Sequence, residues 1–276
     1  LLDEYYLEWD EAWNITSHMM AYTNHTILSE ALEKWPIHYF QTLLPRIYMI
    51  IEEINRRFIG FGRMNGFDEL QLNKIKIIKD GQIHMANLAV AGSYSVNGVA
   101  KLHTQILKDQ EMKELNLLYP KKFNNKTNGI SHRRFLAYAN PELTEFLNKY
   151  CKGNVVENIN ILSNLNKYLD DVKVQEEFLA IKKQRKEKLA KLIKDRNDID
   201  IDTDSIIDSQ IKRLHAYKRQ LLDIMYVMSL YFRIKDDPNF KMQKTTFFFA
   251  AKAASSYHFA KKDIKLINCV GQKINN

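Results

Sequence analysis

Apolar residues recur at helical spacing in the first part of the chain. Residues 43–58 carry them every three or four positions, which predicts an amphipathic helix. Pro45 fits the first turn of this helix, where a missing N–H costs little. The apolar face contains Leu44, Ile47, Ile51, Ile54 and Phe58.

Flanking segments predict further helices and loops. Residues 23–35 indicate a helix that Thr23 or Asn24 caps and Pro36 ends. Residues 60–68 contain glycine and have no clear period, which favours a loop.

The pattern continues in the same way toward the middle of the chain. Apolar positions between residues 96 and 106 predict a helix after Gly92. Residues 124–129 form a turn-rich break, and Pro141 opens another short helix.

The second part of the chain alternates between strands and helices. A long basic helix is expected over 181–196, and an acidic stretch follows it. The expected elements after that are a strand at 205–211, a helix at 221–234, a buried strand at 245–253 and a closing helix that Ser255 or Ser256 caps. This order indicates an α/β fold with parallel strands.

Composition narrows the class of protein. The 276 residues are 45% hydrophobic and 27% charged, which is typical of a globular chain. No apolar run approaches the roughly 20 residues that cross a membrane, and the first residues lack a secretory signal pattern. We therefore expect no membrane partner. The two cysteines, Cys151 and Cys269, give neither a disulfide framework nor a CxxC metal pair, which leads us to expect a cytoplasmic protein.

The net charge of +8 leaves several partners open. It fits nucleic acid, an anionic surface, anionic small substrates or simply solvated lysines. No contiguous basic face interleaved with stacking aromatics is evident, so we do not expect nucleic-acid binding.

The run at 210–220, QIKRLHAYKRQ, is the densest candidate site. It lies between a predicted strand and a predicted helix, where the ligand crevice of an open α/β sheet forms and where free N–H groups attract an anion. Arginine and lysine bind phosphate oxygens, and no glycine-rich loop takes their place. The alternative is a basic helix start that faces water. The charged and aromatic residues of the run at 210–220 are Lys212, Arg213, His215, Tyr217, Lys218 and Arg219.

Other polar clusters are less specific. His25 lies in YTNHT, where polar residues also serve as helix caps. Gly92, Ser93 and Tyr94 begin a small polar cluster that close helix packing explains equally well. No His, Cys or Asp spacing matches a metal site, and no GxSxG nucleophile turn is present.

Five segments in order resemble the α-glucan phosphorylases, the glycogen, starch and maltodextrin phosphorylase family. They are AYTNHTILSEALEKWP, HMANLAVAGSYSVNGVAKLH, KKFNNKTNGISHRRF, QIKRLHAYKRQLLD and FFFAAKAASSYHFAKK, and they span most of the chain. The resemblance implies a GT-B architecture, with the helix-rich end of a first Rossmann-like domain at 1–180 and the start of a second at 181–276. It also implies a cytoplasmic glycosyltransferase, commonly a homodimer, that uses pyridoxal 5'-phosphate and releases glucose 1-phosphate from α-1,4-glucans with inorganic phosphate.

The resemblance also implies residue roles. Arg213 and Lys218 match the residues that bind the substrate phosphate, and Lys212 and His215 match those at the cofactor phosphate. His25 matches the histidine beside the glucosyl site. Tyr217, Tyr94 and Arg185 match positions that line the site or contact the sugar.

The chain departs from the family pattern at several of these positions. Tyr94 stands in place of a histidine, Arg185 in place of an asparagine and Ala216 in place of a glutamate, and residues 254–257 replace a Pro-Gly turn. These differences concern sugar recognition more than phosphate binding.

The family's Schiff-base lysine lies in a glycine-rich segment that has no counterpart here. We therefore expect an internal fragment, inactive alone, with a domain boundary near 173–181. The alternative is a non-catalytic glucan- or anion-binding module of the same fold.

Overall fold

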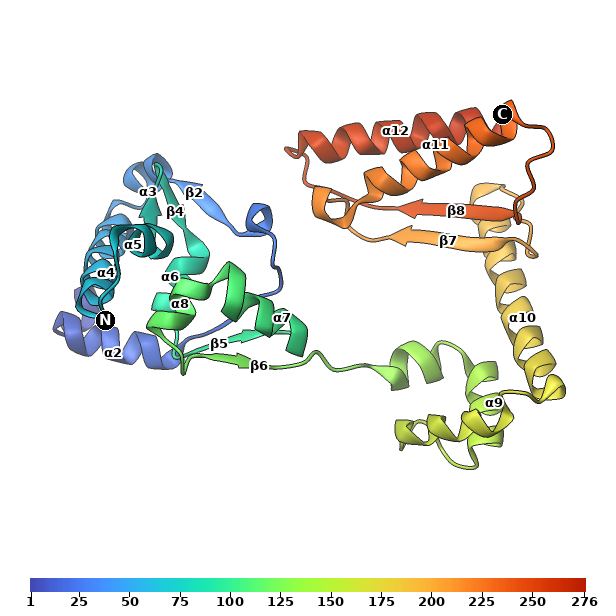
Figure 1. The fold of residues 1–276 in the computed structure, drawn as a ribbon, viewed down its shortest axis with the longest axis horizontal. Coiled ribbons are helices and arrows are strands. Elements are labelled where there is room, and N and C mark those ends of the chain that lie inside the picture. Colours follow the sequence, from blue (N-terminus) through green and yellow to red (C-terminus); the bar gives the residue numbers. More distant parts are fainter. The chain divides into compact units, whose positions relative to one another are not determined.

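A computed structural model describes all 276 residues as two compact units (Figure 1). The first unit is Leu1–Ile130 and the second is Ser131–Asn276. The expected boundary between residues 180 and 181 lies inside one continuous helix, α10 (Val172–Asn197). That boundary, like the GT-B arrangement, stays a prediction about domains of the complete protein.

Three parallel strands form one sheet of the first unit. Their order is β1 (Ala21–Thr23), β5 (Ser95–Gly98) and β6 (Phe123–Asn125). Ala21 pairs with Ser95, and Val96 pairs with both Tyr22 and Phe123. Parallel pairing places the carboxyl ends of all three strands along one edge.

A second sheet of this unit is antiparallel, in the order β2 (Lys34–Pro36), β4 (Gln82–His84) and β3 (Ile78–Lys79). The remaining elements are α1 (Leu2–Tyr5), α2 (Trp9–Met19), η1 (Ser29–Ala31), α3 (Ile37–Leu43), α4 (Pro45–Met64), α5 (Glu69–Ile75), α6 (Met85–Ala91), α7 (Lys101–Ile106), η2 (Leu107–Glu111) and α8 (Lys113–Leu118).

Helix α4 confirms the predicted helix, with Pro45 in its first turn, but Leu44 and Ile47 of the predicted apolar face are exposed. Ile51 and Phe58 on its inner face are buried in the core of the first unit, where Leu72 and Ile83 are fully buried. Each such side chain contributes about 1.5–3 kcal/mol by leaving water. Hydrophobic burial therefore supports α4 more than helix propensity does.

Three expectations for the first unit were wrong. The expected helix at 23–35 is two short strands, β1 and β2, joined by coil and η1. The expected helix at 96–106 begins only at Lys101, because Val96 is buried in the centre of the parallel sheet. The expected loop at 60–68 is mostly helix, because α4 continues to Met64. Short apolar runs fit both the helical and the strand period, and pairing with distant strands decided which element forms.

The second unit begins with helices. These are η3 (Arg133–Tyr138), α9 (Pro141–Cys151), η4 (Ile159–Tyr168) and α10. Pro141 opens α9 as predicted, and the Asn140 side chain accepts a hydrogen bond from the Leu143 N–H. Asp171 caps α10 in the same way. A core of five buried residues joins these elements: Phe146, Leu147, Cys151, Val155 and Val174.

The rest of the second unit confirms the predicted strand–helix–strand–helix order. Strand β7 (Ile206–Ile211) pairs in parallel with β8 (Thr245–Ala250). Between them lie η5 (Ala216–Lys218) and α11 (Gln220–Asp236), and α12 (His258–Asn275) follows. The α/β class with parallel strands is therefore confirmed.

Two details of this region differ from expectation. Tyr257 is the N-cap residue of α12 and no side chain caps the helix, so neither Ser255 nor Ser256 has the predicted role. Strand β8 was expected to be buried, but its first five residues are half-buried and its last is exposed. Only β7 pairs with it, so one edge of the strand lacks a neighbour.

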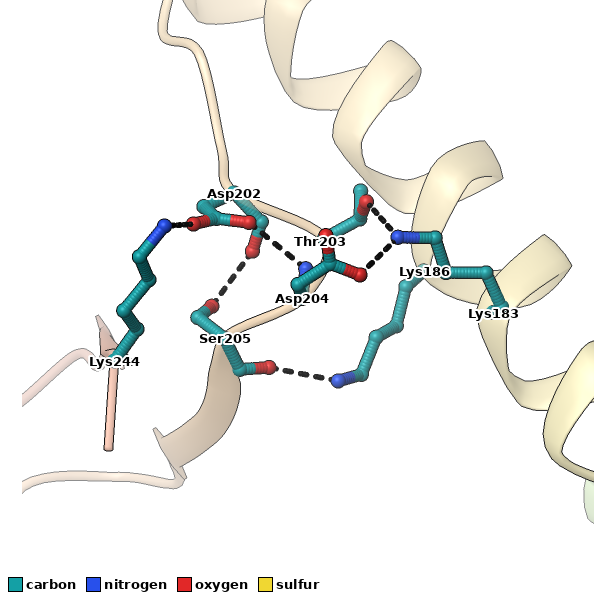
Figure 2. Close-up of polar contacts among 7 residues, drawn as sticks. All are labelled: Lys183, Lys186, Asp202, Thr203, Asp204, Ser205 and Lys244. Carbon is teal, nitrogen blue, oxygen red and sulfur yellow. Dashed lines mark hydrogen bonds and ion pairs between the residues drawn. The ribbon is translucent and has the colours of Figure 1, made fainter.

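Figure 2 shows the polar network that joins α10 to the amino end of β7. Lys183 pairs with Asp204 and donates to Thr203 Oγ1 at 2.8 Å, while Lys186 Nζ donates to the Ser205 carbonyl at 2.7 Å. Lys244 pairs with Asp202 at 2.9 Å. The basic face of α10 is thus partly compensated by the acidic stretch that follows it.

No helix combines the length and apolar character needed to cross a lipid bilayer. The two cysteines are unpaired, with Cys151 buried and Cys269 exposed.

We expect Gly98→Ala to destabilise the first unit. An added Cβ would overlap Thr104 Oγ1 and lie 3.0 Å from the Thr104 Cα and N atoms, and the backbone atoms cannot move aside cheaply. The expected loss in the free energy of unfolding is about 1–3 kcal/mol, measured by urea denaturation. Gly129→Ala is the matched control, since nothing lies within 4 Å of its added Cβ. Equal midpoints for the two variants would contradict the close packing at Gly98.

The buried carboxyl of Asp263 predicts a pH-dependent stability. This side chain is 5% exposed, and burial raises its pKa above the ordinary value of 3.8. The folded state therefore holds the proton more tightly, and the stability that this group contributes below pH 3.8 is lost as the pH rises through the folded pKa.

We expect Asp263→Asn to raise the melting temperature at pH 7 by about 2–4 °C, the shift that about 1 kcal/mol produces in a chain of this size. The gain should shrink as the pH approaches 3, where the wild-type carboxyl is protonated in both states. Scanning calorimetry at several pH values measures this, with the exposed Asp170→Asn as control. A gain independent of pH would assign the effect to packing.

Candidate functional site

The basic run predicted at the strand-to-helix junction lies where the sequence places it. Lys212 directly follows β7, and α11 begins at Gln220. Arg219 is the N-cap residue of α11 and has a left-handed backbone, with φ of 59°. The run therefore occupies the carboxyl end of a parallel strand and the N-terminus of a 17-residue helix, which together favour an anion.

The four cationic side chains of the run have no anionic partners in the chain. Lys212, Arg213, Lys218 and Arg219 form none of its ion pairs and donate no side-chain hydrogen bond. Lysines at the opposite, amino end of the same strands are compensated (Figure 2). Four like charges within eight residues repel one another, so an anionic ligand would relieve the repulsion.

Gln220 holds the backbone of the run. This side chain is 1% exposed, and its Nε2 donates to the Arg213 carbonyl at 3.1 Å. Its Oε1 accepts weakly from the His215 N–H at 3.4 Å. The Leu214 N–H donates to the Lys252 carbonyl at 3.1 Å, which ties the run to the segment that follows β8. The cations thus project from a fixed loop.

His215 lies among aromatic rings. Its ring centroid is 4.4 Å from that of Tyr217 and 5.1 Å from that of Tyr257. The Tyr257 hydroxyl oxygen accepts from the Ala216 N–H at 3.2 Å. His215 Nδ1 is buried and has no hydrogen-bond partner. This nitrogen is therefore available to a bound group.

The first turn of α11 carries a half-buried carboxyl, that of Asp223. Burial raises the pKa of Asp223, and the nearby Asp208 charge adds to the shift, while the Gln210 side chain and the Lys212 charge oppose it. Asp223 Oδ2 is buried without a partner.

In the first unit, the predicted residue His25 lies on a turn that residues not predicted from the sequence hold in place. His25 is exposed and lies two residues beyond the end of β1. The preceding residue, Asn24, is 1% exposed, and its N–H donates to the Asn97 carbonyl at 2.9 Å. Thr23 Oγ1 also donates to Asn97 Oδ1 at 2.9 Å. The turn that carries His25 is therefore anchored to β5.

Tyr94 is not beside His25. Its N–H donates to the Met20 carbonyl, so it lies at the amino ends of β1 and β5, whereas His25 lies at the carboxyl end. At about 3.3 Å per residue the two backbones are separated by on the order of 10–15 Å. The Tyr94 side chain is 55% exposed. That Tyr94 and His25 contact the same sugar stays a prediction, and the register of β1 with β5 does not favour it.

Arg185 is engaged within its own unit. Its Nη2 donates to the Ala139 carbonyl at 2.7 Å, and its Nη1 lies 3.3 Å from Glu142 Oε2. Glu142 also pairs with Lys188. These contacts join α10 to the segment around α9, and a sugar contact by Arg185 stays a prediction.

Sequence reasoning missed the residues that support the site. Gln220 and Tyr257 lie inside segments that the resemblance covers, but their roles depend on contacts with backbone groups 5–7 and 41 residues away. Asn24 and His103 are joined across 79 residues of chain. The sequence signals were a glutamine at the first helical position and an asparagine beside His25.

The chemistry open to the site is anion binding and proton exchange. No group of three His, Cys, Asp or Glu side chains is arranged to hold a metal ion. Four free cations with a buried, unpartnered imidazole nitrogen fit phosphate oxygens, and Lys212 and His215 are the residues available to a cofactor phosphate.

The whole chain matches a known protein family and several named relatives. A sequence model of the family described as carbohydrate phosphorylase matches residues 1–276. The chain is 50% identical over 277 residues to glycogen phosphorylase of Bacillus subtilis (strain 168) and 41% identical over 280 residues to the muscle form of Rattus norvegicus. Glycogen phosphorylase of Synechocystis sp. (strain ATCC 27184 / PCC 6803 / Kazusa) is also 41% identical over 280 residues.

In each comparison the alignment covers 100% of this chain and 33–35% of the relative. The chain thus spans about a third of the length of these relatives. The match over every residue confirms the resemblance drawn from the five segments, and the chain belongs to the carbohydrate phosphorylase family.

Proposed function

We propose that the complete protein containing this chain cleaves α-1,4-glucans by phosphorolysis, as a glycosyltransferase that releases glucose 1-phosphate. The observation that carries the proposal is the unpaired cation cluster at Lys212–Arg219, held by Gln220 at the carboxyl end of β7. Membership of the family and the printed names of its relatives support the substrate class.

In this proposal Arg213 and Lys218 bind the substrate phosphate. A phosphate oxygen forms a bond to the anomeric carbon as the glycosidic C–O bond breaks, and a proton from the substrate phosphate passes to the leaving oxygen. Fixed positive charge stabilises the phosphate dianion beside the developing charge. Arginine supplies a planar pair of donors, lysine supplies a compact charge, and the Tyr217 ring lies beside both His215 and Lys218.

Lys212 and His215 would hold the phosphate of pyridoxal 5'-phosphate. The fit rests on the buried, unpartnered Nδ1 of His215 and on the unpaired ammonium of Lys212. When bound, the cofactor supplies a second phosphate that exchanges a proton with the substrate phosphate. The task of this chain's residues is to offset the repulsion between two neighbouring phosphates.

On the glucan side, His25 is the residue that the geometry favours. It is exposed at the carboxyl edge of its sheet, on a turn that buried hydrogen bonds fix. Roles for Tyr94 and Arg185 in sugar binding, a homodimer and a cytoplasmic location all remain predictions from the family resemblance.

We expect Arg213→Ala to weaken binding of inorganic phosphate by about 10-fold, because it removes one charge-assisted contact worth roughly 1.4 kcal/mol. Isothermal titration of the 276-residue chain with phosphate measures the dissociation constant. Arg196→Ala is the matched control, an exposed arginine of α10 that forms no ion pair. Unchanged affinity in Arg213→Ala would remove the assigned role.

The proposed activity is tested in the complete protein. With maltodextrin and inorganic phosphate it should release glucose 1-phosphate, and Arg213→Ala should lower kcat/KM for phosphate by at least about 10-fold. Coupled detection of glucose 1-phosphate is the measurement. Binding of glucan without phosphate-dependent release would instead indicate the non-catalytic glucan-binding module.

A further inference from the structure

An imidazole links two turns at the carboxyl edge of the β1–β5–β6 sheet. His103, in α7, contacts the turn after β5 through Nδ1 and the turn after β1 through Nε2. The Val99 N–H donates to His103 Nδ1 at 3.0 Å, and His103 Nε2 lies 3.0 Å from Asn24 Oδ1. Asn24 directly precedes His25.

The partners fix the tautomer of this imidazole. A backbone N–H can only donate, so Nδ1 must be the acceptor and carry no hydrogen. Asn24 Oδ1 also accepts from the Thr26 N–H at 2.9 Å, and Asn24 Nδ2 donates to Tyr22 Oη at 3.1 Å. The amide is therefore oriented, and the Nε2 of a neutral His103 must donate to its oxygen.

The link completes the hydrogen bonding of a buried carboxamide. Asn24 makes hydrogen bonds through its N–H, Nδ2 and Oδ1, and only the bond from His103 comes from a side chain that is distant in the sequence. Burial raises the pKa of the Tyr22 phenol, the group that receives the Asn24 amide hydrogen, so it stays neutral. Loss of the imidazole donor would leave one carboxamide oxygen with a single local partner.

We propose that His103 is a positioning residue for glucan binding, and that its Nε2–H tautomer holds the turn carrying His25 in register with the turn after β5. His103 itself does not contact the sugar. This inference rests on the proposed function for its effect on glucan, whereas the bridge itself is a property of the chain alone.

Three substitutions separate the two hydrogen bonds. His103→Gln places an amide donor near the position of Nε2 and retains the bond to Asn24, whereas His103→Asn retains an acceptor for the Val99 N–H. His103→Leu removes both bonds at similar volume. His38→Gln is the control, because His38 is exposed and makes no hydrogen bond.

The first measurement needs no activity. Long-range 1H–15N NMR of the histidine side chains in the 276-residue chain, assigned with His103→Gln, should show the Nε2–H tautomer at pH 7. The Thr26 amide should exchange with solvent faster in His103→Asn and His103→Leu than in His103→Gln. An Nδ1–H tautomer, or equal Thr26 exchange in all variants, would overturn the bridge even if a leucine variant failed to fold.

The second measurement uses the complete protein. His103→Asn and His103→Leu should raise KM for glucan or lower kcat by about 10- to 100-fold, the cost of a misplaced contact group, and His103→Gln should recover most of the loss. The dissociation constant for inorganic phosphate should stay within about twofold, since the His103 side chain hydrogen-bonds only to Val99 and Asn24 and to no residue of the Lys212–Arg219 run.

These outcomes distinguish the two proposals. A complete wild-type protein without phosphorolysis would refute the proposed function while the NMR data still decide the bridge. An active protein in which all three His103 variants match His38→Gln would refute the positioning role.

Discussion

Parallel pairing places the carboxyl ends of β1, β5 and β6 on one edge of the first sheet, and those of β7 and β8 on one edge of the last. The polar residues that follow each strand must then gather at that edge. His25 and its supporting turn follow β1, and the basic run follows β7. The direction of the strands therefore sets the location of both candidate sites, independently of the side chains that form them.

The two sheet edges differ in their charge. In the first unit, neutral groups of Asn24, Asn97 and His103 satisfy one another and fix a turn without net charge. In the second unit, cations stay unpaired while buried backbone contacts through Gln220 hold the loop. Fixed donors without internal partners are what an anionic ligand requires.

The amino ends of β7 and β8 show the contrast within the same sheet. There, Lys183 from α10 and Lys244, the residue before β8, pair with the acidic stretch that precedes β7 (Figure 2). Charge compensation joins the helix to the sheet at one end, and uncompensated charge marks the other. Net charge alone gives no sign of this division, because the compensated and uncompensated lysines count equally toward +8.

The sequence by itself predicted the existence of α4, α9 and α10 and the β7–α11–β8 order, because their periods are long and Pro45 and Pro141 agree with two of the helix starts. It did not predict that α10 begins at Val172 or that α4 continues to Met64. It also located the basic run, since charge density and the strand-to-helix junction are local. The tertiary structure decided the short strands β1 and β5, which pair across about 70 residues and carry too little period to be told from helix. It alone brought His103 to Asn24 and separated Tyr94 from His25, because register between distant strands depends on pairing and burial and not on local sequence.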